Sequence, residues 1–150
     1  MKKLATVLAA TAMLFSASAF TKDKNDTKAI TMVQQSFKKD FSQAVNPSWR
    51  KIGDVYIANF FVNKVEIEAA YNDDGELLGT LKHVAAGDIP LALTMAIAKK
   101  YPGYQVAKVA DEVTFERQTS YYINVGNTKE ILKLKCYVNG DITVDKKTKI

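Results

Sequence analysis

The chain has 150 residues, of which 47% are hydrophobic and 25% are charged, and its formal net charge is +5. These values fit one globular domain and exclude a disordered chain, a coiled coil and a collagen-like repeat. Because Cys136 is the only cysteine, an internal disulfide and a cysteine-based metal site are also excluded.

The first 19 residues have the pattern of a secretory signal peptide. Two lysines precede an apolar run over residues 4–15, and Ala17-Ser18-Ala19 forms a small-x-small cleavage site. The run is shorter than the ~20 residues that a membrane-spanning helix needs. We therefore expect an exported chain, periplasmic or secreted, with no transmembrane segment. Residues 20–29 are polar and are expected to form a flexible leader.

Two segments have apolar residues at the three- and four-residue spacing of an amphipathic helix. The first has these residues at Ile30, Val33, Phe37 and Phe41. The second runs from about Pro90 to Tyr101, with Asp88 as its predicted cap. A shift of 60 residues places Val33 on Leu93 and Phe37 on Ile97, so the two helices look like copies.

Strand pairs are predicted after each helix, beginning with first strands at 45–51 and 105–113. A two-residue turn at Asn63-Lys64 makes every inward pair apolar: Val62 with Val65, Phe60 with Ile67, Ala58 with Ala69, and Tyr56 with Tyr71. A shift of 65 residues repeats the register: Val125 with Leu132, Ile123 with Leu134, and Tyr121 with Cys136.

The next turn in each half is a three-residue loop that ends in glycine, at Gly75 and at Gly140. This register places charges of opposite sign across the outward face: Glu66 opposite Lys82, and Lys133 opposite Asp145.

The predicted fold class is α+β, a tandem duplication of a helix plus a four-stranded antiparallel meander. The two halves form one open, curved sheet of about eight strands with the helices on one face. No linker separates them. Residues 30–150 are thus expected to be a single domain made of repeats 30–88 and 89–150.

Several short motifs occur in a fixed order over residues 30–150: Asn46-Pro47-Ser48-Trp49, residues 55–60, residues 68–75, Ile89-Pro90, Lys100-Tyr101-Pro102, Ser120-Tyr121-Tyr122 and Asn139-Gly140. Together they resemble the β-lactamase-inhibitor-like, PepSY-like domain family of secreted bacterial proteins. The resemblance implies two helix-plus-four-strand repeats and the binding of a protein or peptide outside the cytoplasm. It supplies no catalytic residues. The chain lacks the disulfides of the related secreted inhibitors, so a true β-lactamase inhibitor is not expected.

Catalytic, metal-binding and nucleic-acid-binding patterns are missing from the sequence. His83 is the only histidine, and no serine lies in a Gly-x-Ser-x-Gly elbow. Asp73-Asp74-Gly75 fits a hairpin loop better than a calcium loop, because two leucines follow where further ligands are needed. The lysines are scattered along the chain apart from Lys146, Lys147 and Lys149, which are expected to form a solvated end. We therefore expect no enzyme activity, no cofactor, no metal and no nucleic acid partner.

The face of the sheet opposite the helices is the candidate site for a protein or peptide partner. The register places nine residues on it: Ile57, Asn59, Phe61, Glu66, Glu68, Tyr122, Asn124, Lys133 and Lys135. This set is polar with interleaved aromatic residues, acidic in the first half and basic in the second. The leading hypothesis is an inhibitor-like binding module. The alternative is a structural or self-assembling envelope protein without a foreign ligand. The sequence leaves the partner's identity and the oligomeric state open.

Overall fold

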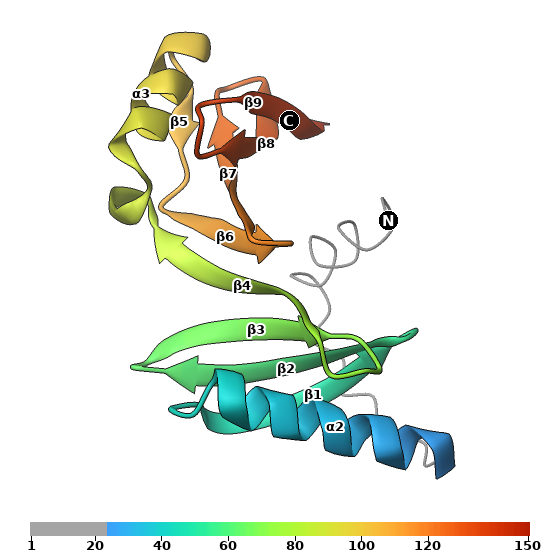
Figure 1. Ribbon diagram of the computed structural model, residues 1–150. Helices are drawn as coiled ribbons and strands as arrows, with labels where there is room; N and C mark the ends of the chain where they lie inside the picture. Colours follow the sequence, from blue (N-terminus) through green and yellow to red (C-terminus); the bar gives the residue numbers. More distant parts are fainter. Residues whose placement is uncertain (1–23) are drawn as a thin grey trace. The chain divides into compact units, whose positions relative to one another are not determined.

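The computed structural model of the chain describes residues 24–150, and the predicted signal peptide lies outside this range. Within it, nine strands form one antiparallel sheet with two α-helices (Figure 1). The hydrogen-bonded order is β1-β2-β3-β4-β6-β7-β8-β9, and β5 pairs with β7. The predicted α+β fold with an open sheet is confirmed, and β1 and β9 are its edge strands.

The chain forms two compact units, and the division falls between Leu81 and Lys82, within β4. The first unit contains α2 (Lys24–Asp40), β1 (Val45–Ile52), β2 (Val55–Val62), β3 (Val65–Tyr71) and the start of β4 (Leu77–Ala85). The second contains the end of β4, a short 3₁₀ helix (Ala86–Asp88), α3 (Leu91–Lys100), β5 (Gln105–Val106), β6 (Val109–Phe115), β7 (Gln118–Gly126), β8 (Glu130–Tyr137) and β9 (Ile142–Lys149).

In the first unit, α2 covers one face of the strands with the apolar stripe that its sequence predicts. Val33 and Phe37 are buried, and the Phe37 ring lies 4.9 Å from that of Phe60 on β2. The end of the helix is held to β3 by Tyr71, whose hydroxyl donates to Asp40 at 3.1 Å. The helix begins at Lys24, so the part of the predicted leader that the structure describes is helical. Polar residues can extend a helix beyond its packed stripe because the backbone hydrogen bonds are internal.

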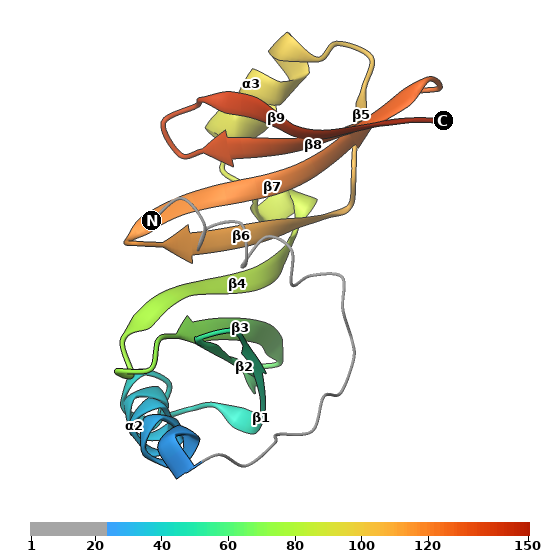
Figure 2. The same cartoon turned by 90° about the vertical axis from the view of Figure 1, so that its right-hand side faces the viewer.

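In the second unit, α3 covers one face of its own strands in the same way (Figure 2). Leu93 and Ile97 are fully buried against Ile123 and Leu134 of β7 and β8. The predicted helix is confirmed, but its predicted cap is wrong. Asp88 belongs to the preceding 3₁₀ helix, and Pro90 occupies the N-cap position without a side-chain hydrogen bond.

Both predicted hairpin registers are confirmed. All four inward pairs of β2 with β3 and all three inward pairs of β7 with β8 occur as predicted. Asn63 and Lys64 both have positive φ (51° and 67°), as a type I′ turn requires. The two glycine loops also match: the Gly75 amide donates to Asn72 and the Gly140 amide donates to Tyr137. The halves therefore share a local design, and an origin by duplication stays a prediction.

The predicted strand over residues 105–113 is wrong as one strand, because the backbone changes hydrogen-bonding partners in its middle. The Ala107 amide still donates to Asn124 of β7, whereas the Lys108 carbonyl accepts from Ala86, just after β4. The segment is therefore split into β5 and β6, and the sheet has nine strands instead of about eight.

Of the two charge pairs expected across the outward face, that of Lys133 with Asp145 is wrong, and that of Glu66 with Lys82 stays a prediction. The pairing of β8 with β9 shifts between Lys133 and Leu134, and this bulge places Lys146 opposite Lys133 in the position expected for Asp145. In β4, the Lys82 ammonium lies 3.0 Å from a Glu112 oxygen, and Glu66 accepts a hydrogen bond from Asn59.

Cys136 lies on the helix-covered face of β8 and is fully buried. Burial raises the pKa of its thiol from 9.0 to about 11, although nearby Lys100 lowers it. Thiolate is the reactive form, so we expect a thiol reagent at pH 8 to label Cys136 at least tenfold more slowly in the native protein than in urea.

The same shift predicts a loss of stability in alkali. The Cys136 thiol ionises near pH 9 in the unfolded chain but only near pH 11 in the folded chain. Between these pH values the unfolded chain has lost the proton that the folded chain still binds, so the free energy of unfolding should fall as the pH rises. Cys136→Ala should show a smaller fall in urea titrations across these pH values. Equal labelling rates in buffer and in urea would contradict the burial of this thiol. So would an equal fall in the free energy of unfolding for the unchanged protein and for Cys136→Ala.

Candidate protein-binding faces

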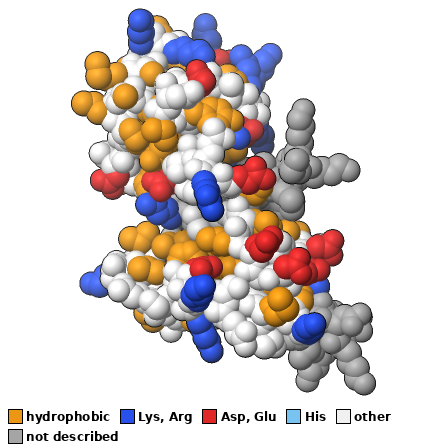
Figure 3. Space-filling model, in the orientation of Figure 1, with side chains coloured by type: hydrophobic (Ala, Val, Ile, Leu, Met, Phe, Trp, Pro, Cys, Tyr) orange, Lys and Arg blue, Asp and Glu red, His pale blue; other side chains and the backbone are white. Residues whose placement is uncertain are grey.

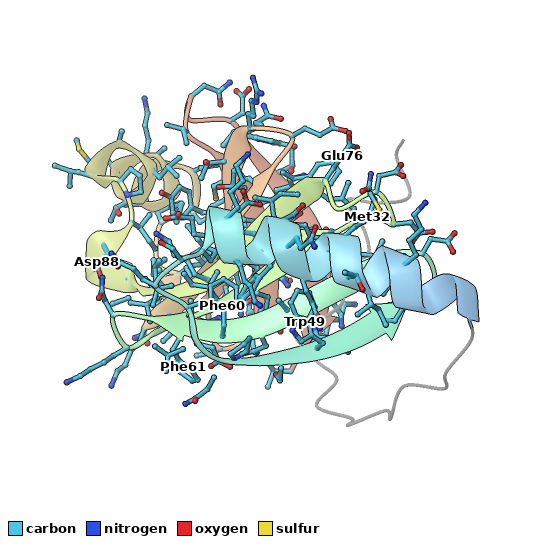
Figure 4. The ribbon with its side chains drawn as sticks, turned by 60° about the horizontal axis from the view of Figure 1, so that its bottom comes forward. Met32, Trp49, Phe60, Phe61, Glu76 and Asp88 are labelled. Carbon is cyan, nitrogen blue, oxygen red and sulfur yellow. The ribbon has the colours of Figure 1, made fainter. Side chains whose placement is uncertain are left out.

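In the first unit, the five predicted site residues share the face of β2 and β3 that lies opposite α2. They are Ile57, Asn59 and Phe61 on β2, and Glu66 and Glu68 on β3, with Asn59 opposite Glu68 and Phe61 opposite Glu66. Phe60 and Phe61 are neighbours in sequence and point to opposite faces (Figure 4). Phe60 is completely buried beneath α2, whereas 40% of Phe61 is exposed.

Two polar contacts fix the side chains around Phe61. The Asn59 amide donates to Glu66 at 2.9 Å, and the Arg50 guanidinium on β1 pairs with Glu68 at 2.9 Å. Because Arg50 neutralises Glu68, this face is less acidic than the sequence suggested. Arg50 was missed because the register of β1 was not predicted. A bulge at Asn46-Pro47 shifts that strand against β2.

Ile57 is only 2% exposed, so the prediction that it belongs to an accessible surface is wrong. Arg50 lies opposite Ile57 on one side of β2, and Glu68 lies one row away on the other side. Their ion pair therefore bridges β2 beside Ile57 and shields it from solvent. Phe61 remains the exposed apolar group among the five predicted residues of this unit.

In the second unit, the four predicted residues also share one face, opposite α3. Tyr122 lies opposite Lys135, and Asn124 lies opposite Lys133. The ammonium groups of Lys133 and Lys135 lie 5.1 and 5.7 Å from the centre of the Tyr122 ring. Only 7% of Tyr122 is exposed, so its expected role as an open aromatic contact is wrong. The two lysines cover the ring and gain cation–π attraction.

Asn124 is exposed at the end of this face, where it lines a groove of about 670 Å³ together with Val106, Ile131 and Ile150. Lys135 is also in contact with Tyr137, its ammonium 5.1 Å from that ring. Partial burial lowers the pKa of Lys135, but interactions with the hydroxyls of Tyr137 and Tyr122 outweigh it and raise the pKa overall. Lys135 therefore remains charged at neutral pH.

His83 lies near the same face, and its Nδ1 is 2.8 Å from Asp111, the residue opposite Tyr122. A histidine oriented by a carboxylate needs a nucleophile before it can act as a general base in covalent catalysis. Among the described residues, no hydroxyl or thiol hydrogen-bonds to His83. Residues 24–150 also contain no group of three or more metal-ligating side chains.

Comparison with solved structures finds the same fold in several proteins from Bacteroides species. A BLIP-like protein from Bacteroides fragilis aligns over 80% of this chain and 85% of its own, with 18% identity and a TM-score of 0.66. A DUF2874 family protein from Bacteroides ovatus aligns over 87% and 89%, with 23% identity and the same TM-score. A candidate periplasmic protein from Bacteroides eggerthii aligns over 88% and 91%, with 20% identity and a TM-score of 0.66.

No family model matches the chain, and no curated protein matches it. The resemblance read from the sequence is confirmed for the inhibitor-like fold and supported only loosely for the PepSY-like part. No helix in residues 24–150 is long and apolar enough to cross a membrane.

Proposed function

We propose that this chain is an exported, non-catalytic binding module that contacts a protein or peptide through the sheet faces opposite its helices. The observation that carries the proposal is Phe61, an aromatic side chain left 40% exposed on a sheet face. Its polar neighbours are already held by the Asn59–Glu66 and Arg50–Glu68 contacts.

An exposed aromatic group within a fixed polar frame is the arrangement expected of a binding anchor. Burying such a group supplies a large share of the affinity of many protein interfaces. Polar neighbours that are already ordered lose little conformational entropy when a partner docks. The first-unit face therefore favours association with a partner that offers an apolar pocket for Phe61.

The solved structures that share this fold support the proposal. One neighbour is BLIP-like, and another is a candidate periplasmic protein. A fold by itself does not determine a function. The argument for binding therefore depends on Phe61 and its surroundings, and export depends on the signal-peptide pattern of residues 1–19.

Self-assembly through the sheet edges has less support. The edge strand β9 has exposed lysines at 146, 147 and 149, and the edge strand β1 contains Pro47 beside a bulge. Charged side chains, proline and bulges at edges all hinder strand addition by another copy.

The test is capture from an envelope extract of the source bacterium by the immobilised protein and two variants. Phe61→Ala should reduce retention of a specific protein at least tenfold, because the anchor is removed. Met95→Ala is the matched control, since Met95 is 64% exposed on α3 and lies away from the proposed surface.

Retention by the control should equal that by the unchanged protein, and thermal unfolding should confirm that both variants fold. Equal retention by all three proteins would reject Phe61 as the anchor. The absence of any retained protein, combined with a salt-sensitive oligomer in light scattering, would favour the self-assembling alternative.

A further inference from the structure

We infer that the second-unit face binds an acidic, extended protein segment through Lys133, Lys135 and Lys146, here named the lysine cluster. The inference rests on the proposed function and specifies the chemistry of the partner. It starts from the bulge between β8 and β9, which replaces an expected ion pair with two lysines placed opposite each other.

The bulge concentrates positive charge where a regular strand would neutralise it. A regular register would place Asp145 opposite Lys133, but the shift places Lys146 there. Like charges directly across a strand pair repel and destabilise the sheet. Bulges commonly redirect side chains next to functional sites. A binding role for the displaced lysine accounts for an arrangement that is unfavourable in the free protein.

The lysine cluster has no counter-charge among the described residues. Within residues 24–150, no carboxylate lies within 4.0 Å of the ammonium groups of Lys133, Lys135 or Lys146. Two other lysines of the second unit are paired by contrast: Lys147 lies 2.6 Å from Glu130, and Lys82 lies 3.0 Å from Glu112. Figure 3 shows that basic side chains gather around β9. The cluster is therefore complementary to an external anion.

The spacing of the cluster fits carboxylates on an extended chain. Lys133 and Lys135 are alternate residues of β8, so their Cα atoms are about 7 Å apart. Lys146 lies across from Lys133, at the ~5 Å separation of opposed residues. Acidic side chains at alternate positions of an extended segment repeat at the same ~7 Å interval. Such a segment could place one carboxylate near each lysine of β8.

The aromatic group at the centre of the cluster argues against a nucleic acid. Proteins that hold single strands stack bases on exposed aromatic rings. Tyr122 is 7% exposed, and Lys133 and Lys135 lie over its ring. The ring therefore holds the ammonium groups in place and offers no stacking surface. An acidic protein segment is the anion that this face fits better.

The test is a titration of the purified protein, followed by amide chemical shifts, with a ten-residue peptide of alternating Glu and Thr. The largest shifts should map to residues 122, 133, 135 and 146, and binding should weaken steeply with added salt. The peptide with Gln in place of Glu should bind at least tenfold more weakly. The variant Lys133→Gln/Lys135→Gln/Lys146→Gln should lose at least tenfold in affinity for the acidic peptide.

The matched control is Lys38→Gln/Lys39→Gln/Lys99→Gln, which removes the same charge from exposed helix positions. Its affinity for the acidic peptide should stay within twofold of that of the unchanged protein. Equal losses in both triple variants, equal binding of the Gln peptide, or tighter binding of an oligothymidine would each overturn the inference. If the cluster variant fails to fold, Lys146→Gln alone should reduce affinity at least threefold, and an unchanged affinity would overturn the inference.

This titration is independent of the native partner. If it fails while capture still depends on Phe61, the acidic segment is rejected and the binding module stands. If capture is independent of Phe61 while the peptide binds the lysine cluster, the first-unit anchor is rejected instead.

Discussion

Phe60→Ala is expected to lower the free energy of unfolding by about 3–5 kcal/mol, the range for truncating a buried phenylalanine. Phe60 is completely buried, and its ring lies 4.9 Å from Phe37 and 4.7 Å from Phe41 of the α2 region. Truncation would remove both ring contacts and leave a cavity between α2 and the strands. Urea denaturation followed by tryptophan fluorescence measures the loss, because Trp49 is also in contact with Phe37.

Phe61→Ala is the control that the chain itself provides. The two residues are adjacent, have the same side chain and differ in the face of β2 that they occupy (Figure 4). Since Phe61 is partly exposed and lies outside the core, its truncation should cost less than about 1 kcal/mol. Comparable losses for the two variants would contradict the placement of Phe60 inside and Phe61 outside.

This pair of residues shows why so much of the fold could be predicted from sequence. In a half-buried strand every second residue is apolar, and a slip of one residue would turn Phe61 inward and Phe60 outward. Periodicity therefore determined both hairpin registers, and in the first hairpin it agrees with a turn that has positive φ at Asn63 and Lys64. The helices were predicted in the same way, from apolar residues at a spacing of three and four.

The strand features that the sequence did not predict interrupt a regular period. The bulge between Lys133 and Leu134 and the change of partners at Ala107–Lys108 depend on how strands twist and on which neighbouring backbone groups are free to pair. No local residue pattern specifies these events. Asp145 was therefore placed opposite Lys133, whereas it lies in the bulge, between the residues that pair with Lys133 and Leu134.

The candidate site was predicted in part for a related reason. Alternation is sufficient to assign residues to a face, and all nine predicted residues occupy the expected faces of their own units. Exposure depends on side chains from other strands. Arg50 shields Ile57, and Lys133 with Lys135 covers Tyr122. Such covering contacts cannot be read from periodicity.

The loop at Gly75 gives a second large prediction. Gly75 has a φ of +76°, and a Cβ atom there would lie 2.8 Å from the Ser36 hydroxyl oxygen and 3.2 Å from the Met32 carbonyl oxygen of α2. A non-glycine residue in this conformation costs about 1–2 kcal/mol, and overpacking against a helix adds about 1–3 kcal/mol. Gly75→Ala is therefore expected to lower the free energy of unfolding by about 2–5 kcal/mol.

Gly140 occupies the matching loop and separates the two causes of that loss. Its φ is +94°, but a Cβ atom there would have no neighbour within 4 Å. Gly140→Ala should therefore cost only the backbone strain, about 1–2 kcal/mol. Urea denaturation of both variants measures the difference between them, which is the energetic cost of the contact between the Gly75 loop and α2. Equal losses would mean that the loop can move away from the helix, and that α2 is held by Val33, Phe37 and the Tyr71–Asp40 hydrogen bond without it.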